Sequence, residues 1–174
     1  KLRVFSDGAN GFDYRPYFIV ARQIDPGLSV ERDDIMHCPA APRPASLHWN
    51  SYAVNFTSNT AMGVAWPRET SPDGKTRIGV LSLPMVNDPA GYPLLLDSCT
   101  PSGSEEFRIL YTSTVGLRHG GKANAFFLDG SARSLDLNDL AKLGPNGTKA
   151  LAPAHVFDCS QNPPLSVSLP PPVP

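Results

Sequence analysis

The stretch RHGGKANAFFLDGSARSL, from Arg118 to Leu135, contains a histidine and a carboxylate that could do chemistry together, His119 and Asp129. A carboxylate that is hydrogen bonded to a histidine orients it as a general base, and both residue types bind metal ions. An extended strand rises about 3.3 Å per residue, so the ten residues from His119 to Asp129 would span roughly 33 Å. We therefore predict that these two side chains form neither a catalytic dyad nor a shared metal site.

The Asp129-Gly130 pair indicates a β-hairpin instead. It lies between the segments AFFL and SARSL, and a two-residue type I′ turn needs residues that tolerate positive φ. In such a hairpin Phe126 would face Arg133, and apolar side chains would lie on both faces of the first strand. We predict an inner pair of strands joined by a two-residue turn, with His119 at the entry to the first strand.

Three further histidines, His37, His48 and His155, could also act as bases. Neither a G-x-S-x-G segment nor a cysteine in a catalytic context accompanies them, so the sequence does not indicate a hydrolase. The chain has 15 basic and 16 acidic residues without a cluster of lysine and arginine, which argues against a nucleic-acid partner. No run approaches the roughly 18 apolar residues that a membrane-spanning helix needs.

The three cysteines are Cys38, Cys99 and Cys159. They lie too far apart for a zinc site, which needs paired ligands at C-x(2 to 4)-C spacing. We expect an internal disulfide, with Cys99 and Cys159 slightly preferred as its partners. The odd count would then leave one thiol over, or pair it with a cysteine outside this chain.

The length of 174 residues suits one domain, and 19 prolines with 14 glycines predict long loops and little helix. Alternation and apolar runs predict three strands, at 51–56, 77–83 and 92–97. Capping and stop signals predict two short helices, at 29–36 and 136–143. In the second helix, Asp136 is the expected N-cap, Gly144 the expected stop, and Leu137, Leu140 and Ala141 the expected apolar face.

We place the domain at residues 1–160 and a proline-rich segment at 161–174. The segment NPPLSVSLPPPVP should be extended and loosely packed unless another part of the protein holds it.

Three pieces of the sequence, in the same order and at similar spacing, carry a resemblance to a known family. They are HCPAAPRPASLHWNSYAVNF, with Cys38-Pro39 followed by Ser51, Tyr52 and Asn55; YPLLLDS, with Asp97; and RHGGKANAFFLDGSARSL, with His119, Asp129 and Gly130. Together they resemble the H-x(9)-D-G family of bacterial prepilin-like proteins. The resemblance covers Met36 to Leu143.

The resemblance implies an α+β fold, a pilin-like globular head with an antiparallel β-sheet, short helices and long loops rich in proline and glycine. It also implies a non-enzymatic, pseudopilin-like subunit of a type II secretion or type IV pilus-like assembly, located in the bacterial cell envelope outside the cytoplasm. Its partners would be other pilin-like subunits, contacted through an N-terminal apolar helix that would also be its sole contact with the membrane. The segment KLRVFSDGAN contains no such helix, so we expect that the chain is a head domain without it.

Pseudopilins of secretion systems often hold calcium in a C-terminal loop. Asp136, Asn138 and Asp139 offer oxygen ligands here, but their spacing matches no defined ligand order, and helix capping by Asp136 is the preferred interpretation. We therefore expect no metal site and no cofactor.

The alternative function is a secreted or cell-surface module that binds carbohydrate or protein. Such a module would use exposed aromatic side chains, for which Trp49, Tyr52 and Trp66 are the candidates, although each fits a core position as well.

Overall fold

The fold was derived from a computed structural model of the chain. Side chains are described through most of the second half of the chain, and several strands of the first half are described by their backbone. The described residues are 2–8, 11–13, 52–55, 58–65, 67–70, 76–99, 108–109, 114–143 and 155–171.

The largest sheet is mixed and has the strand order β10-β9-β6-β3-β7. Its strands are β10 (Ala132–Leu135), β9 (Ala123–Phe127), β6 (Pro93–Asp97), β3 (Tyr52–Asn55) and β7 (Arg108–Ile109). The apolar run of β6 lies in the middle of the sheet, where both faces are covered and four of its five residues are buried. The pairs are antiparallel except β3 with β7, which is parallel.

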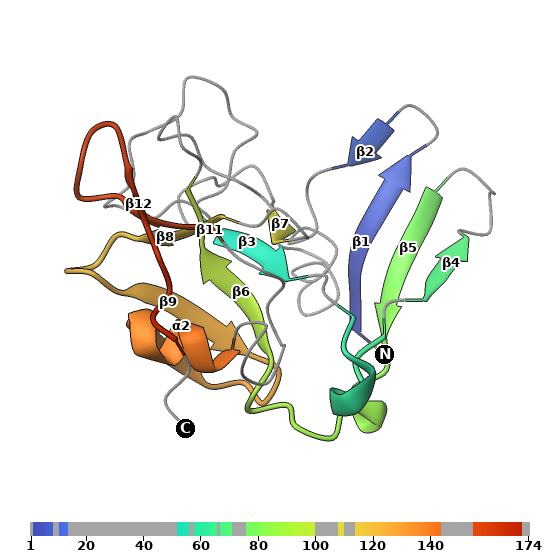
Figure 1. Ribbon diagram of the computed structural model, residues 1–174. Coiled ribbons are helices and arrows are strands. Elements are labelled where there is room, and N and C mark those ends of the chain that lie inside the picture. Colours follow the sequence, from blue (N-terminus) through green and yellow to red (C-terminus); the bar gives the residue numbers. More distant parts are fainter. Residues whose placement is uncertain are drawn as a thin grey trace.

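A second sheet is antiparallel and has the order β2-β1-β5-β4. Its strands are β2 (Gly11–Asp13), β1 (Leu2–Gly8), β5 (Thr76–Leu81) and β4 (Arg68–Thr70). Figure 1 shows these strands on one side of the molecule, away from the helix α2 (Leu137–Leu143). Two single-turn 3-10 helices, η2 (Thr60–Met62) and η3 (Leu83–Met85), lie on the chain between the two sheets.

The third sheet has the order β12-β11-β8, formed by β12 (Leu165–Val167), β11 (His155–Asp158) and β8 (Thr114–Leu117). β11 is parallel to β8 and antiparallel to β12. Part of the proline-rich segment is thus held in a sheet, and Leu169 beyond it packs against the core. A bridge between Ser98 and Val115 connects this sheet to the end of β6.

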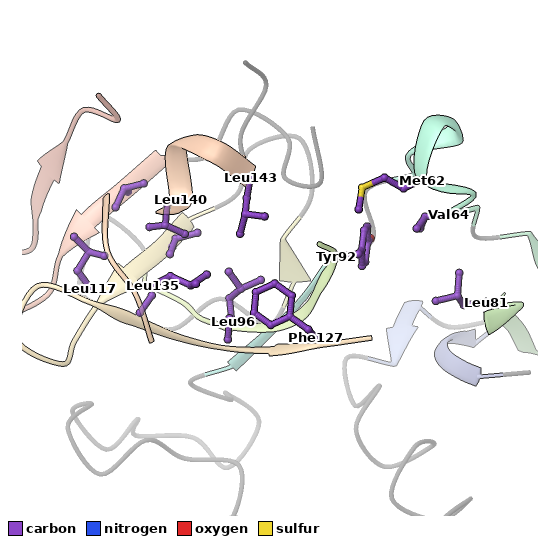
Figure 2. Close-up of a cluster of buried hydrophobic side chains, with 14 residues drawn as sticks. Met62, Val64, Leu81, Tyr92, Leu96, Leu117, Phe127, Leu135, Leu140 and Leu143 are labelled. Carbon is purple, nitrogen blue, oxygen red and sulfur yellow. The ribbon is translucent and has the colours of Figure 1, made fainter. Parts of the chain in front are cut away.

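One apolar core extends under these elements (Figure 2). Phe127 of β9 and Leu96 of β6 are almost completely buried, and burial of each side chain contributes about 1.5–3 kcal/mol. Arg133 covers the ring of Phe127 from the edge strand, with its guanidinium carbon 3.6 Å from the ring centroid, and donates a hydrogen bond to the carbonyl of Ala90. The core members are Met62, Val64, Leu81, Tyr92, Leu96, Val115, Leu117, Ala123, Ala125, Phe127, Leu135, Leu140, Leu143 and Val156.

The helix α2 begins at the predicted cap. The Oδ1 atom of Asp136 accepts hydrogen bonds from the backbone N–H of Asn138 at 2.9 Å and of Asp139 at 3.0 Å. The Asp139 carboxylate accepts in return from the N–H of Asp136 at 3.4 Å, which completes a capping box. Leu140 and Ala141 are buried as predicted, together with Leu143, while Leu137 is partly buried against the core.

The hairpin at Asp129-Gly130 forms, but the prediction of a two-residue turn is wrong. Phe126 faces Ala132 instead of Arg133, and the N–H of Phe127 donates to the carbonyl of Ser131 at 2.8 Å, so three residues form the loop. Gly130 has a φ of 87° and its N–H donates to the carbonyl of Phe127. A type I turn followed by a left-handed glycine needs positive φ at one residue, whereas a type I′ turn needs it at two.

The prediction of an inner strand pair is also wrong for β10, which forms an edge of the described sheet. The prediction rested on apolar side chains on both faces of β9, but the two faces differ in burial. Ala123, Ala125 and Phe127 point into the core, whereas Phe126 on the other face is 40% exposed. Apolar character on that face therefore did not require a covering layer.

The fold class agrees with the α+β expectation in its coarse form, because the described residues form small sheets with few helices. The expected strands appear as β3, β5 and β6, while the predicted helix at 29–36 lies outside the described residues. The expected antiparallel sheet is present as β2-β1-β5-β4, while the other two sheets are mixed because of the parallel pairs β3 with β7 and β8 with β11. Among the described helices, none has the length and apolar character needed to cross a membrane.

The hairpin geometry predicts the effect of replacing Gly130. A Cβ atom at Gly130 would meet nothing within 4 Å, so the penalty of Gly130→Ala comes from the left-handed backbone alone. We expect the free energy of unfolding to fall by about 1–2 kcal/mol, measured by urea denaturation. Gly130→Asn is the matched control and should lose less, because asparagine tolerates this conformation. Equal stability of Gly130→Ala and the parent protein would contradict the three-residue loop.

Candidate functional site

The candidate site is a polar cluster at the end of β6, where the chain leaves the core. Asp97 is the last residue of β6 and its side chain is completely buried. Ser98 follows it, also buried, and pairs with Val115 of β8. The residues around this point come from β6, β8, β9 and the turn between β8 and β9.

The turn that follows β8 brings His119 back over Asp97. The N–H of His119 donates to the carbonyl of Lys122 at 3.1 Å, and Gly120 and Gly121 supply the two left-handed residues of the turn, with φ values of 60° and 78°. The Nε2 atom of His119 then lies 3.2 Å from Oδ2 of Asp97. The pair joins a half-buried imidazole to a fully buried carboxylate.

The Oδ2 atom of Asp97 has a second donor. The backbone N–H of Asn124, in β9, donates to it at 2.6 Å. The Oδ1 atom is buried and finds no hydrogen-bond partner among the described residues. A buried carboxylate with one unsatisfied oxygen is costly to ionise.

The surroundings of Asp97 change its pKa in both directions. Burial raises the pKa of this carboxyl above its ordinary value, while the Asn124 amide and the electrostatic interactions with His119 and Arg118 oppose that rise. The guanidinium of Arg118 is fixed by the carbonyl of Ser98, to which Nε donates at 3.2 Å and Nη2 at 2.6 Å. Arg118 and His119, which are adjacent in the chain, therefore contact Ser98 and Asp97, which are adjacent at the end of β6.

Two cysteine side chains border the cluster. Cys99 is fully buried, and Cys159 is hydrogen bonded to it, which with burial raises the pKa of the Cys159 thiol well above its usual range. A catalytic cysteine requires the opposite, a thiolate stabilised near neutral pH. The raised pKa keeps the Cys159 thiol protonated near neutral pH.

A further buried polar group lies at the other end of β6. The Nδ2 atom of Asn55 donates to the carbonyl of Pro93 at 3.0 Å, and the hydroxyl of Tyr92 donates to the carbonyl of Asn55 at 3.0 Å. Asn55 is completely buried. These bonds connect β3 to the start of β6.

The structure does not bring His119 and Asp129 together. The extended strand β9 lies between them, as their spacing predicts, and the Oδ1 atom of Asp129 accepts from the N–H and the hydroxyl of Ser131 at 2.9 and 2.6 Å. The histidine pairs with a carboxylate, but with Asp97 of another strand. An aspartate that ends an apolar run was the sequence signal for this pair, because a carboxylate at the end of a central strand requires a partner.

The other candidate residues are not part of the described cluster. His155 is exposed and pairs with Thr114, at the opposite end of β8 from His119. His37, His48, Cys38 and Trp49, together with the side chains of Tyr52 and Trp66, lie outside the described part. Among the side chains described, no group of three or more His, Cys, Asp or Glu could hold a metal ion.

Comparisons with known protein families, with curated proteins and with solved structures find no match to this chain. The internal contacts of the cluster are therefore the basis for a functional proposal, alongside the resemblance of the sequence motifs.

The opposite pKa directions of two aspartates predict opposite pH effects. The folded protein raises the pKa of Asp97, so its contribution to stability is fully present below the unfolded value of about 4 and is lost as the pH rises through the higher folded value. Hydrogen bonds from Ser131 lower the pKa of Asp129, so its contribution is present above about pH 4 and is lost as the pH falls.

The test compares Asp97→Asn with Asp129→Asn, since both substitutions remove a charge and keep an acceptor oxygen. We expect the free energy of unfolding of the parent, minus that of Asp97→Asn, to fall as the pH rises above about 4. The same difference for Asp129→Asn should increase as the pH rises towards about 4. Urea denaturation over about pH 3 to 8 measures both. The same slope for the two variants would contradict the assignment of Asp97.

Gly116 gives a packing prediction. A Cβ atom there would lie 2.9 Å from Cβ of Cys99, 3.0 Å from the carbonyl oxygen of Ser98 and 3.1 Å from Sγ of Cys159. We expect Gly116→Ala to lower the free energy of unfolding by about 1–3 kcal/mol because the site is already filled, and Gly116→Val to lower it further. A stabilising effect of Gly116→Ala would show that β8 lies farther from the two cysteines.

Proposed function

We propose that the chain is the non-enzymatic head domain of a pseudopilin-like subunit, part of a type II secretion or type IV pilus-like assembly in the bacterial cell envelope. The head lies outside the cytoplasm and has the pilin-like α+β architecture. Its sequence basis is the ordered set of three motif pieces between Met36 and Leu143.

One observation carries this proposal: the described motif residues make internal contacts that tie neighbouring strands together. Asn55 links β3 to β6, Asp97 links β6 to the β8–β9 turn and to β9, and His119 contacts Asp97. Asp129 and Gly130 form the turn between β9 and β10. Residues used in this way specify a scaffold, which is what a structural subunit needs from its head.

The chemistry of the cluster supports a structural interpretation over a catalytic one. The Nε2 atom of His119 is directed at a buried carboxylate, and the neighbouring Cys159 thiol has a raised pKa. A general base works best when its pKa is near the operating pH and a nucleophile lies within hydrogen-bond distance. A raised thiol pKa lowers the fraction of thiolate, which is the nucleophilic form of cysteine.

Assembly would then depend on an apolar N-terminal helix encoded upstream of Lys1. In this proposal the helix packs against those of other pilin-like subunits and provides the contact with the membrane, while the head stays folded by its own core. No cofactor has a role in this function.

The gene upstream of Lys1 tests the proposal. We expect it to encode a short basic leader followed by about 20 apolar residues, the length needed to span a bilayer. Co-expression of the full-length protein with a prepilin peptidase should remove the leader, as measured by the intact mass of the product. The head alone, from Lys1 to Pro174, is the matched control and should keep its mass.

A conventional secretory signal with a small-residue cleavage site would contradict this function. Failure of the prepilin peptidase to process a full-length protein that is folded and inserted in the membrane would contradict it as well.

A further inference from the structure

Two cysteines that are distant in the sequence meet across β8. Cys99 follows the end of β6, where Ser98 pairs with Val115 of β8. Cys159 follows β11, which pairs with β8 from the other side, and the N–H of Cys159 donates to the carbonyl of Leu117 at 3.2 Å. The two segments therefore approach the same strand from its two edges.

Gly116 is the reason that the two side chains can meet. It lies between Val115 and Leu117 in β8, and its missing Cβ leaves the space in which the Cβ of Cys99 and the Sγ of Cys159 lie. Both atoms lie within about 3 Å of the position that a Cβ atom of Gly116 would take, at 2.9 Å for Cβ of Cys99 and 3.1 Å for Sγ of Cys159. The Sγ atom of Cys159 also lies 3.6 Å from the carbonyl oxygen of Phe157, within reach of a weak S–H bond.

We propose that Cys99 and Cys159 are a disulfide-forming pair, and that their oxidation fastens the β11–β12 segment to the end of β6. The inference rests on the contacts of the two side chains and is independent of the proposed assembly function.

The oxidant is a low-molecular-weight disulfide such as oxidised glutathione. A thiolate of one cysteine attacks a sulfur of oxidised glutathione, forms a mixed disulfide and releases one glutathione thiolate. The second cysteine, after losing its proton, attacks the protein sulfur of the mixed disulfide and releases the second glutathione. The protein loses two hydrogen atoms in total, and oxidised glutathione is reduced to two glutathione molecules.

The surroundings make this exchange slow in the folded protein. Thiolate is the attacking species, and the interaction of the Cys159 S–H with Cys99, together with burial, raises the pKa of the Cys159 thiol. Cys99 itself is fully buried, which restricts the access of oxidant and of reductant alike. Oxidation therefore takes place during folding, and the disulfide, once formed, resists reduction.

The closed loop would contain β8, the His119 turn, the Asp129-Gly130 hairpin and α2, all of which lie between the two cysteines. A cross-link of this kind stabilises a protein mainly by restricting the unfolded chain. We expect the oxidised protein to melt roughly 4–16 °C above the reduced protein.

Trypsin separates the three cysteines into different peptides and so allows a direct test. Cleavage after lysine and arginine, except before proline, leaves Cys38 in peptide 33–68, Cys99 in 78–108 and Cys159 in 150–174. The chain is refolded from denaturant with oxidised glutathione, remaining thiols are alkylated, and the digest is analysed by mass spectrometry with and without reductant. We expect one cross-linked product, of peptide 78–108 with peptide 150–174, and an alkylated Cys38.

Variants provide a second measurement. Cys38→Ser is the matched control and should keep the difference in melting temperature between the oxidised and reduced forms, whereas Cys99→Ser and Cys159→Ser should lose it. If either of these two variants fails to fold, the peptide map of the parent protein still decides.

The proposal is overturned if Cys99 and Cys159 are both alkylated after oxidative refolding, or if Cys38 is cross-linked to either of them. Neither result would affect the leader and processing test of the assembly function, and failure of that test would leave the peptide map unchanged.

Discussion

The need to satisfy one buried carboxylate organises the centre of this fold. Asp97 ends the apolar strand β6 with a completely buried side chain, and an ion in that position is destabilising unless donors surround it. The donors come from the next part of the chain: the imidazole of His119 and the N–H of Asn124. Because one lies in the turn before β9 and the other in β9 itself, the carboxylate fixes where β9 begins and how it lies against β6.

This constraint continues into the rest of the molecule. β9, once placed beside β6, directs Ala123, Ala125 and Phe127 into the core and leads directly into the hairpin that forms β10. α2 follows β10 and adds Leu140 and Leu143 to the same core (Figure 2). The bidentate contact of Arg118 with the carbonyl of Ser98 holds β8 at the same point, and β8 in turn carries β11 and β12.

Local signals in the sequence were sufficient for features set by a few neighbouring residues. The helix cap at Asp136, the turn at Asp129-Gly130 and the buried strand 92–97 were all predictable for this reason, since each depends on backbone preference or on a short apolar run. The loop length was not, because a single left-handed glycine and a pair of left-handed residues both fit an Asp-Gly sequence. The resulting shift of one residue changed the partner of Phe126.

Features that depend on contacts between distant segments were harder to predict. Distance along an extended strand correctly argued against pairing His119 with Asp129, but it could not identify Asp97 as the partner, because that contact needs the strand order of the sheet. The parallel pairing of β8 with β11 had no sequence signal either. It is this pairing that brings Cys159 to Cys99, and the sequence could only rank that pair slightly above the alternatives.

The position of the motif residues explains why a histidine and an acidic residue at a fixed spacing need not mark an active site. His119 lies at one end of β9 and Asp129 at the other, so the spacing between them reflects the length of the strand and its two turns. A longer or shorter segment would move either the imidazole away from Asp97 or the hairpin turn away from the end of the sheet. The spacing is thus constrained at both ends by contacts within the fold, and this would be true whether or not the protein bound any substrate.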